Sequence, residues 1–129
     1  MAKLRHLAIN VADPEGSAAF FERAFDMERV AESPLVIYLS DGTVNLALIK
    51  IESEDEKPGL AHFGMWVDDL AEAEKKAAEA GAYCLGGRPA SSDGFYERKY
   101  SGNDNIVFDL SDNGWAGAVK DVVPAKSHG

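Results

Sequence analysis

Hydrophobic and polar residues alternate at the start of the chain and then give way to a helical pattern. In LRHLAINV the side chains lie on two sides, Leu7, Ile9 and Val11 on one and His6, Ala8 and Asn10 on the other, which predicts a half-buried strand. Asp13 suits a helix N-cap and Pro14 the first helical position, so DPEGSAAFFERAF predicts a helix. Three strand-like runs follow: ERVAE, LVIYLS and VNLALIK.

The same succession of patterns returns after residues 52–59, ESEDEKPG, an acidic stretch that predicts a solvated connector. AHFGMWV alternates again, with His62, Gly64 and Trp66 opposite the large apolar residues. DDLAEAEKKAAEAG predicts a second capped helix that ends near Gly81. The strand-like runs AYCLGG, FYERKY and NIVFDLS complete the regular part of the chain.

The two halves share a fixed offset as well as an order of elements. His6 and His62 are 56 residues apart, and so are two further pairs, Val11 with Val67 and Asp13 with Asp69. An internal repeat of this size bears on the fold more strongly than any single motif. It predicts one α+β domain over residues 1–129, made of two βαβββ modules at about 3–51 and 60–115, a linker at 52–59 and a tail at 116–129.

Composition narrows the class of protein. The chain of 129 residues is 46% hydrophobic and 27% charged, as in an ordinary globular domain. Its net charge of −9 argues against nucleic acid or an anionic membrane as a partner. No apolar run has the length of a membrane span, and the N-terminus lacks the apolar core of a signal peptide. The single cysteine, Cys84, excludes an internal disulfide and fits a cytoplasmic location.

Histidine recurs at equivalent positions of the two modules. A single histidine near the start of a strand is most simply a half-buried, hydrogen-bonded side chain. His6 and His62, however, both lie opposite the large apolar residues of their strands. If the modules pair about a pseudo-twofold axis, the two imidazoles meet near that axis and form a natural metal site.

A carboxylate on the last strand would complete this set of ligands. Matching VNLAL to IVFDL places Ala47 opposite Asp109 and puts Asp109 on the same side of the sheet as the histidines. The alternative is an edge-strand aspartate that is bonded to backbone or solvent. A shift of one residue in the match would turn Phe108 inward instead, and its side chain cannot bind a metal.

Taken together, three motifs give the chain a family resemblance: RHLAINVADPEGSAAFFERAF, AHFGMWVDDLAEAEKKAAEAG and GNDNIVFDLSDNGW. Over residues 3–115 the chain resembles the vicinal oxygen chelate superfamily of glyoxalases, fosfomycin-resistance enzymes, extradiol dioxygenases and bleomycin-binding proteins. The resemblance implies paired βαβββ modules whose curved mixed sheets surround a cleft. It also implies one divalent metal ion (Fe, Mn, Zn or Ni) on His6, His62 and Asp109. A small-molecule substrate and a homodimer, in some members with modules exchanged between chains, are implied as well.

The chain departs from the family pattern in ways that bear on its chemistry. The family usually has glutamate at the position of Asp109, and GNDN replaces the usual Asp-Pro-Asp-Gly turn before it. Glyoxalase-type isomerases and related epimerases place a fourth ligand, often a catalytic glutamate, near Ala47, which is no base. The three-ligand set therefore resembles the dioxygenases and thiol transferases more closely than the isomerases. The alternative is a metal-free protein of the bleomycin-resistance kind that sequesters a small ligand.

Strand parity and the resemblance suggest further site residues. Tyr96, Arg98 and Tyr100 share one face of their strand. Tyr100 lies about where both three-ligand subfamilies carry a tyrosine near the metal, so it is the predicted catalytic residue; a half-buried strand aromatic is the alternative. Tyr96 and Arg98 are predicted to bind substrate. Asn10 and Trp66 share faces with the two histidines and are predicted to line the cleft, where Trp66 either stacks on substrate or fills space.

Overall fold

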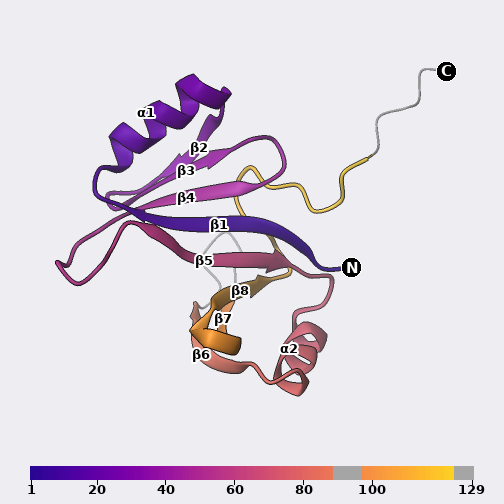
Figure 1. Cartoon of the computed structure of the whole chain (residues 1–129). Coiled ribbons are helices and arrows are strands. Elements are labelled where there is room, and N and C mark those ends of the chain that lie inside the picture. The colour runs from indigo at the N-terminus through magenta and orange to yellow at the C-terminus, as the bar shows by residue number, and fades with distance from the viewer. Residues whose placement is uncertain (89–96, 124–129) are drawn as a thin grey trace.

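The computed structural model describes residues 1–88 and 97–123 and contains the predicted repeat of elements (Figure 1). The first module consists of β1 (Lys3–Val11), α1 (Pro14–Phe25), β2 (Glu28–Glu32), β3 (Val36–Ser40) and β4 (Asn45–Lys50). The second consists of β5 (Gly59–Trp66), α2 (Leu70–Glu79), β6 (Tyr83–Arg88), β7 (Glu97–Ser101) and β8 (Val107–Ser111), with a 3₁₀ turn at Asn103–Asn105.

All eight of these strands form one mixed, curved sheet in the order β2-β3-β4-β1-β5-β8-β7-β6. β1 and β5 pair antiparallel at its centre, whereas β4 and β8 run parallel to their neighbours β1 and β5. In the central pair, His6 lies opposite Gly64 and Ala8 opposite His62. An offset of 56 residues converts the first of these pairs into the second. The pseudo-twofold axis therefore passes through the pair Leu7–Phe63, which lies between them.

Each module has its own hydrophobic core between its helix and one face of the sheet (Figure 1). The first is built on the buried residues Ala18, Ile37, Leu39 and Leu48. The second is built on the buried residues Val67, Tyr100 and Leu110. Because side chains alternate along a strand, the residues between these apolar positions face the opposite, concave side of the sheet. The helices thus leave that side open for a cleft.

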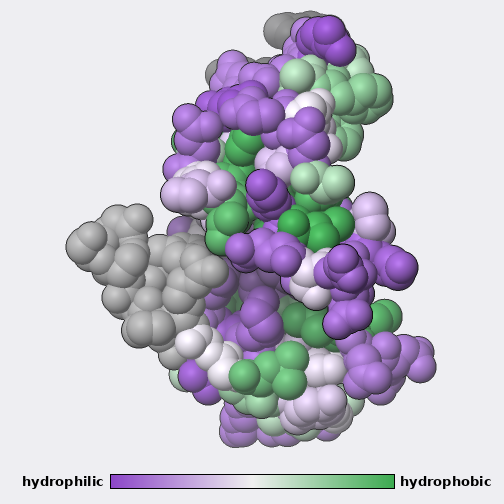
Figure 2. Space-filling view, turned by 90° about the vertical axis from the view of Figure 1, so that its left-hand side faces the viewer, coloured by the Kyte–Doolittle hydropathy of each residue, from purple (hydrophilic) through white to green (hydrophobic). Residues whose placement is uncertain are grey.

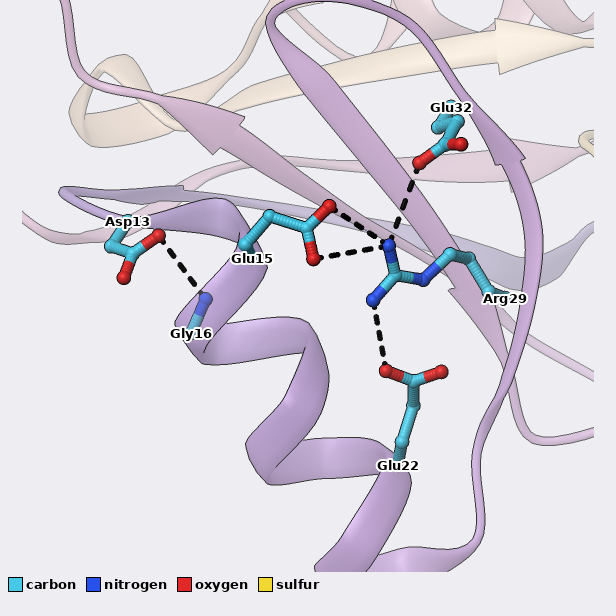
Figure 3. Close-up of polar contacts among 6 residues, drawn as sticks. All are labelled: Asp13, Glu15, Gly16, Glu22, Arg29 and Glu32. Atoms are coloured by element: carbon cyan, nitrogen blue, oxygen red, sulfur yellow. Dashed lines mark hydrogen bonds and ion pairs between the residues drawn. The ribbon is translucent and has the colours of Figure 1, made fainter.

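The helices begin as the sequence predicts. A cluster of ion pairs joins α1 to β2 (Figure 3). The Asp13 carboxylate accepts a hydrogen bond from the Gly16 N–H at 3.1 Å, which satisfies one of the free amides of the first turn. Arg29 on β2 donates to Glu15 and Glu22 on α1 and lies within 3.5 Å of Glu32. These contacts position α1 against β2.

Large hydrophobic side chains also reach the surface. Phe20, Phe25 and Leu60 are between 55% and 65% exposed. Figure 2 views the molecule from the side that lies on the left in Figure 1, and hydrophobic atoms there interrupt a mostly hydrophilic surface. No helix among residues 1–88 and 97–123 is long and apolar enough to cross a membrane.

The chain after β8 turns back across the first module. Asn45 donates to the carbonyl of Ala116 at 2.8 Å, and Ser40 Oγ donates to that of Gly117 at 2.7 Å. The Val119 N–H donates to the Thr43 carbonyl at 2.9 Å. This return places the preceding residue, Trp115, over the centre of the sheet, where its ring stacks on the imidazole of His6.

Candidate metal centre

Three strands bring His6, His62 and Asp109 together on the concave side of the sheet. His6 lies on β1, His62 on β5 and Asp109 on β8. The two Nε2 atoms are 3.3 Å apart, and His62 Nε2 is 3.1 Å from Asp109 Oδ2. One ligand atom from each residue lies within 4.8 Å of the other two. Two ligand atoms at adjacent positions around one ion, each about 2.1 Å from it, are roughly 3 Å apart, so these spacings suit a shared cation.

Asp109 is fully buried, and its carboxylate is a negatively charged group of the site. Its Oδ1 accepts from Lys99 Nζ at 2.6 Å. Burial raises the pKa of Asp109, but the contacts with His62 and Lys99 outweigh it and lower the pKa to about 2. Its Oδ2 has no hydrogen-bond partner in the described part of the chain. A buried carboxylate oxygen without a hydrogen bond is costly and is well suited to an electropositive ligand.

His6 is held in one orientation by Asn45 and Trp115. Its Nδ1 lies 2.7 Å from Asn45 Oδ1, and the Asn45 amide donates to the Ala116 carbonyl. The Asn45 oxygen therefore accepts from Nδ1–H, and the His6 Nε2 lone pair points toward His62. Burial, followed by the nearby His62, lowers the pKa of His6 to about 4, although the Asn45 bond raises it. The neutral imidazole is the form that binds metals.

A glycine permits the stack of Trp115 on His6. The two rings are 4.8 Å apart and almost parallel, and the Trp115 Nε1–H donates to Glu97 Oε2 at 3.3 Å. A Cβ atom at Gly64 would lie 2.6 Å from the Trp115 ring and 2.9 Å from His6 Cβ. Only a residue without a side chain lets the tryptophan lie this close to β5.

A cavity of about 630 Å³ opens beside the three candidate ligands. It is lined by both histidines and, among others, by Ala47, Tyr38, Lys99 and Glu97. Ala8 pairs with Ala47 in the first module, and Gly64 pairs with Asp109 in the second. Since Ala8 and Gly64 are 56 residues apart, Ala47 and Asp109 occupy equivalent places, as the sequence predicts. The first module thus offers no carboxylate where the second has one.

Comparison with known proteins assigns the family. A sequence model of the glyoxalase/bleomycin resistance protein/dioxygenase superfamily matches residues 3–116. The chain belongs to this superfamily. No curated protein matches the sequence significantly.

Several solved structures share the fold. A hypothetical protein from Bacillus halodurans C-125 is 15% identical with a TM-score of 0.69, covering 96% of this chain and 99% of its own. Methylmalonyl-CoA epimerase from Mycobacterium tuberculosis is 18% identical with a TM-score of 0.65, covering 84% and 85%. A Mn(II)-bound glyoxalase from Novosphingobium aromaticivorans is 18% identical with a TM-score of 0.71, covering 95% of this chain and 44% of its own. At these identities the likeness shows the fold alone.

The register settles which residue of β8 faces the superfamily cleft. Phe108 stacks on Tyr100 and packs into the core beneath α2. Asp109 points to the other side, where it meets Lys99 and His62. The prediction of Asp109 as the inward residue is therefore confirmed, and the alternative register with Phe108 inward is wrong.

The structure does not bring Tyr100 or Arg98 to the cleft. Tyr100 is buried in the second core and its hydroxyl donates to Glu74 on α2 at 2.8 Å. Burial and the Glu74 bond raise the pKa of Tyr100 to about 12. Arg98 Nε donates to the same carboxylate at 2.8 Å. The two residues do share a strand face, but it is the face toward the helix, because Lys99, between them, pairs with Asp109.

Two further predicted substrate residues, Trp66 and Asn10, do not line the cavity either. Trp66 donates from Nε1 to the Asp112 carbonyl at 3.2 Å, and its ring packs closely against the backbone of Gly114. Asn10 lies near the far end of β1, paired with Ile49 and Gly59, and neither it nor Trp66 is among the cavity-lining residues. Tyr96 falls outside the described residues.

The residues of the site that were not predicted as such include Asn45, Glu97, Lys99 and Trp115. The signal for Lys99 and Glu97 was present in the parity of β7, where the odd-numbered residues face the cleft. Alternation alone does not show which face of β7 lies toward the cleft, because that depends on the pairing of β7 with β8. Trp115 follows the last strand, and no periodicity there predicts the return of the chain over the sheet.

Proposed function

We propose that the chain is a metal-dependent enzyme of this superfamily, with one divalent ion held by His6, His62 and Asp109. The observation that carries the proposal is the buried Asp109 Oδ2, which has no hydrogen-bond partner among the described residues, lies 3.1 Å from His62 Nε2 and belongs to one cluster with His6. Two histidines and one carboxylate are a common ligand set for divalent transition metals. An ion bound there would act as a Lewis acid on two oxygens of a small substrate.

The chain's own residues prepare this site for substrate. Asn45 fixes the His6 tautomer with its Nε2 toward the site, and Lys99 holds Asp109 Oδ1 so that Oδ2 remains available. Such outer partners of ligands tune affinity and orientation. The side chain of Ala47 leaves the equivalent position in the first module open. Because Ala47 is no base, the site favours dioxygenase-like or thiol-transferase-like chemistry over isomerisation by proton abstraction.

The second candidate function is metal-free binding of a small ligand. The observation that favours it is the ion pair of Lys99 with Asp109, which compensates the buried carboxylate without any ion. The adjoining cavity would then serve as a sequestering site, in the manner of bleomycin-binding proteins.

Metal analysis separates these two functions. Protein from its native host is analysed for bound metal, and metal-stripped protein is titrated calorimetrically with Fe²⁺, Mn²⁺, Zn²⁺ and Ni²⁺. The proposal expects one ion per chain for the wild type and at least a 100-fold loss of affinity in His62→Ala. Asn10→Ala, a polar truncation on β1 away from the cavity, should bind as the wild type does. A wild-type protein that binds a small ligand but no metal would contradict the proposal of a metal-dependent enzyme and favour the sequestering protein.

A positive metal result leads to a test of the reaction. Oxygen uptake is measured with catechols for the dioxygenase-like reaction, and thiol consumption with an epoxide for the transferase-like one. His62→Ala should abolish whichever activity the metal-loaded wild type shows. The protein could instead interconvert an α-hydroxy or α-keto isomer pair and show neither oxygen uptake nor thiol consumption. That result would identify an isomerase and refute the inference that Ala47 disfavours isomerisation.

The proposal also includes a homodimer in the cytoplasm. The exposed Phe20, Phe25 and Leu60 support a protein contact. One chain alone brings all three ligands together, so exchange of modules between subunits is not required to complete the site. Light scattering after size-exclusion chromatography should give twice the 13.9 kDa mass of the chain.

A further inference from the structure

The two walls of the cleft are formed by equivalent strands of the two modules, but their side chains differ in chemistry. Tyr38 pairs with Ala47 across β3 and β4, and Lys99 pairs with Asp109 across β7 and β8. The repeat therefore places Tyr38 and Lys99 at equivalent positions. Two residues earlier on the same strands, the first module has Val36 and the second has Glu97. All of these except the fully buried Asp109 line the cavity.

The wall from the first module is apolar over a continuous stretch. Beside the polar Asn45, five residues form this part of the cavity lining: Ala31, Val36, Tyr38, Ala47 and Ile49. They come from three adjacent strands, β2, β3 and β4. A surface of this kind binds hydrocarbon or aromatic groups, whose burial is worth roughly 25 cal/mol per Å².

The wall from the second module carries a cation that still reaches the cleft. Lys99 Nζ has three N–H donors, and Asp109 Oδ1 accepts one of them. The Lys99 side chain remains 37% exposed. A divalent ion on the neighbouring ligands would itself outweigh the Asp109 charge. Lys99 would then present a positive charge to the cavity, where an anion is favoured.

We infer that the substrate is a small amphipathic anion, with its charged oxygen group at Lys99 and its apolar body against the first-module wall. Lys99 is the residue that selects the charge, and Tyr38 belongs to the surface that selects the body. The cavity volume of about 630 Å³ suits a small molecule of this kind. The inference deepens the proposed function and rests on it for the ion beside Lys99.

Three probes separate the two parts of this substrate. Benzoate has both the charge and the ring, benzamide has the ring without the charge, and acetate has the charge without the ring. Their binding to Zn²⁺-loaded protein is measured by calorimetry and by quenching of tryptophan fluorescence, since Trp115 lines the cavity. We expect benzoate to bind at least 10-fold more tightly than either of the other two.

Variants assign the selectivity to the two walls. Lys99→Met should remove at least 10-fold of the benzoate affinity with little effect on benzamide, and Lys99→Arg should restore most of it. Tyr38→Ala should weaken benzoate and benzamide equally and leave acetate unchanged. Lys57→Met, the same charge loss in the connector, is the control and should behave as the wild type does. Bound Zn²⁺ is quantified in every variant, so that loss of the ion is not mistaken for loss of the anion site.

The outcomes keep the inference distinct from the proposed function. Equal affinities for benzoate and benzamide in Zn²⁺-loaded protein, or a preference that survives Lys99→Met, would overturn the inference while leaving the metal site intact. If no metal binds, the proposed function fails and the same probes are applied to metal-free protein. A benzoate preference that depends on Lys99 there upholds the inference, and its absence overturns it.

Discussion

Asn45 shows how one residue makes the two halves of the site unequal. The register places Asn45 opposite His6. The equivalent place in the second module, opposite His62, belongs to Val107, because Phe63 pairs with Phe108 and Gly64 with Asp109. Valine cannot accept a hydrogen bond from an imidazole, so at this position only the first histidine has an amide to fix its tautomer. The second instead depends on its contact with Asp109.

Replacing Asn45 by the residue of the other module tests this assignment. Asn45→Val removes the acceptor for His6 Nδ1–H, and we expect metal affinity to fall about 10- to 100-fold. Asn45→Asp keeps an acceptor and should retain the affinity. Competition with a chromophoric chelator measures both.

Asn10→Val makes the same change on β1 away from the cavity and serves as the control. Because Asn45 also holds Ala116, thermal melts are recorded to separate loss of folding from loss of affinity. An unchanged affinity in folded Asn45→Val would show that the amide does not position His6.

At the scale of elements, the sequence predicts what depends on local periodicity and capping. The order of strands and helices, the Asp13 cap and the equivalence of Ala47 with Asp109 all follow from it. For the second helix the sequence leaves Asp68 and Asp69 open as the cap, and the structure has Asp69. The face of β7 does not follow, because alternation leaves two choices and the long-range pairing with β8 makes the selection. The Asp109–Lys99 ion pair also depends on the pairing of β7 with β8, so the alternation of side chains along β7 could not reveal it.

The close approach of β5 to Trp115 gives an element-scale prediction. Gly64→Ala places a methyl group 2.6 Å from the Trp115 ring, so the ring or the strand must shift. We expect a loss of about 1–3 kcal/mol in the free energy of unfolding, as for other overpacked sites. Urea denaturation followed by circular dichroism measures it.

Gly102→Ala is the matched control, because its new methyl group would lie 3.6 Å from the nearest atom, in ordinary contact. It should change the free energy of unfolding much less. The near-ultraviolet signal of tryptophan should change only in Gly64→Ala. Equal stability of the two variants would mean that Trp115 does not lie against β5.

At the scale of the whole molecule, the candidate site spans the boundary between the two modules. His6 comes from the first module, and His62 and Asp109 come from the second. The segment after β8 crosses the same boundary, since its backbone is bonded to Ser40, Thr43 and Asn45. The side chains of the candidate site are therefore buried only when both modules are folded together. Their titration is for this reason linked to the free energy of unfolding of the whole molecule.

This linkage predicts how metal-free protein responds to acid. The folded-state pKa of His6 is about 4, below the ordinary histidine value of 6.5. Between these values the unfolded chain binds the proton and the folded chain does not, so stability falls as pH falls from 6.5 to 4. The full shift corresponds to about 3 kcal/mol in the free energy of unfolding. The pKa of Asp109, about 2 against 3.8, adds a further loss as pH falls from 3.8 toward 2.

Urea unfolding of chelator-treated protein at half-unit steps from pH 8 to pH 4 measures this dependence. Because only groups whose pKa differs between the folded and unfolded states contribute, His6→Gln should lose most of the slope between pH 6.5 and 4. Its stability should approach that of the wild type at the acid end, where the wild type has lost the contribution of neutral His6. If His6→Gln keeps the full wild-type slope, the histidine is not held neutral by burial, and the orientation that Asn45 and Trp115 give it is not the one described.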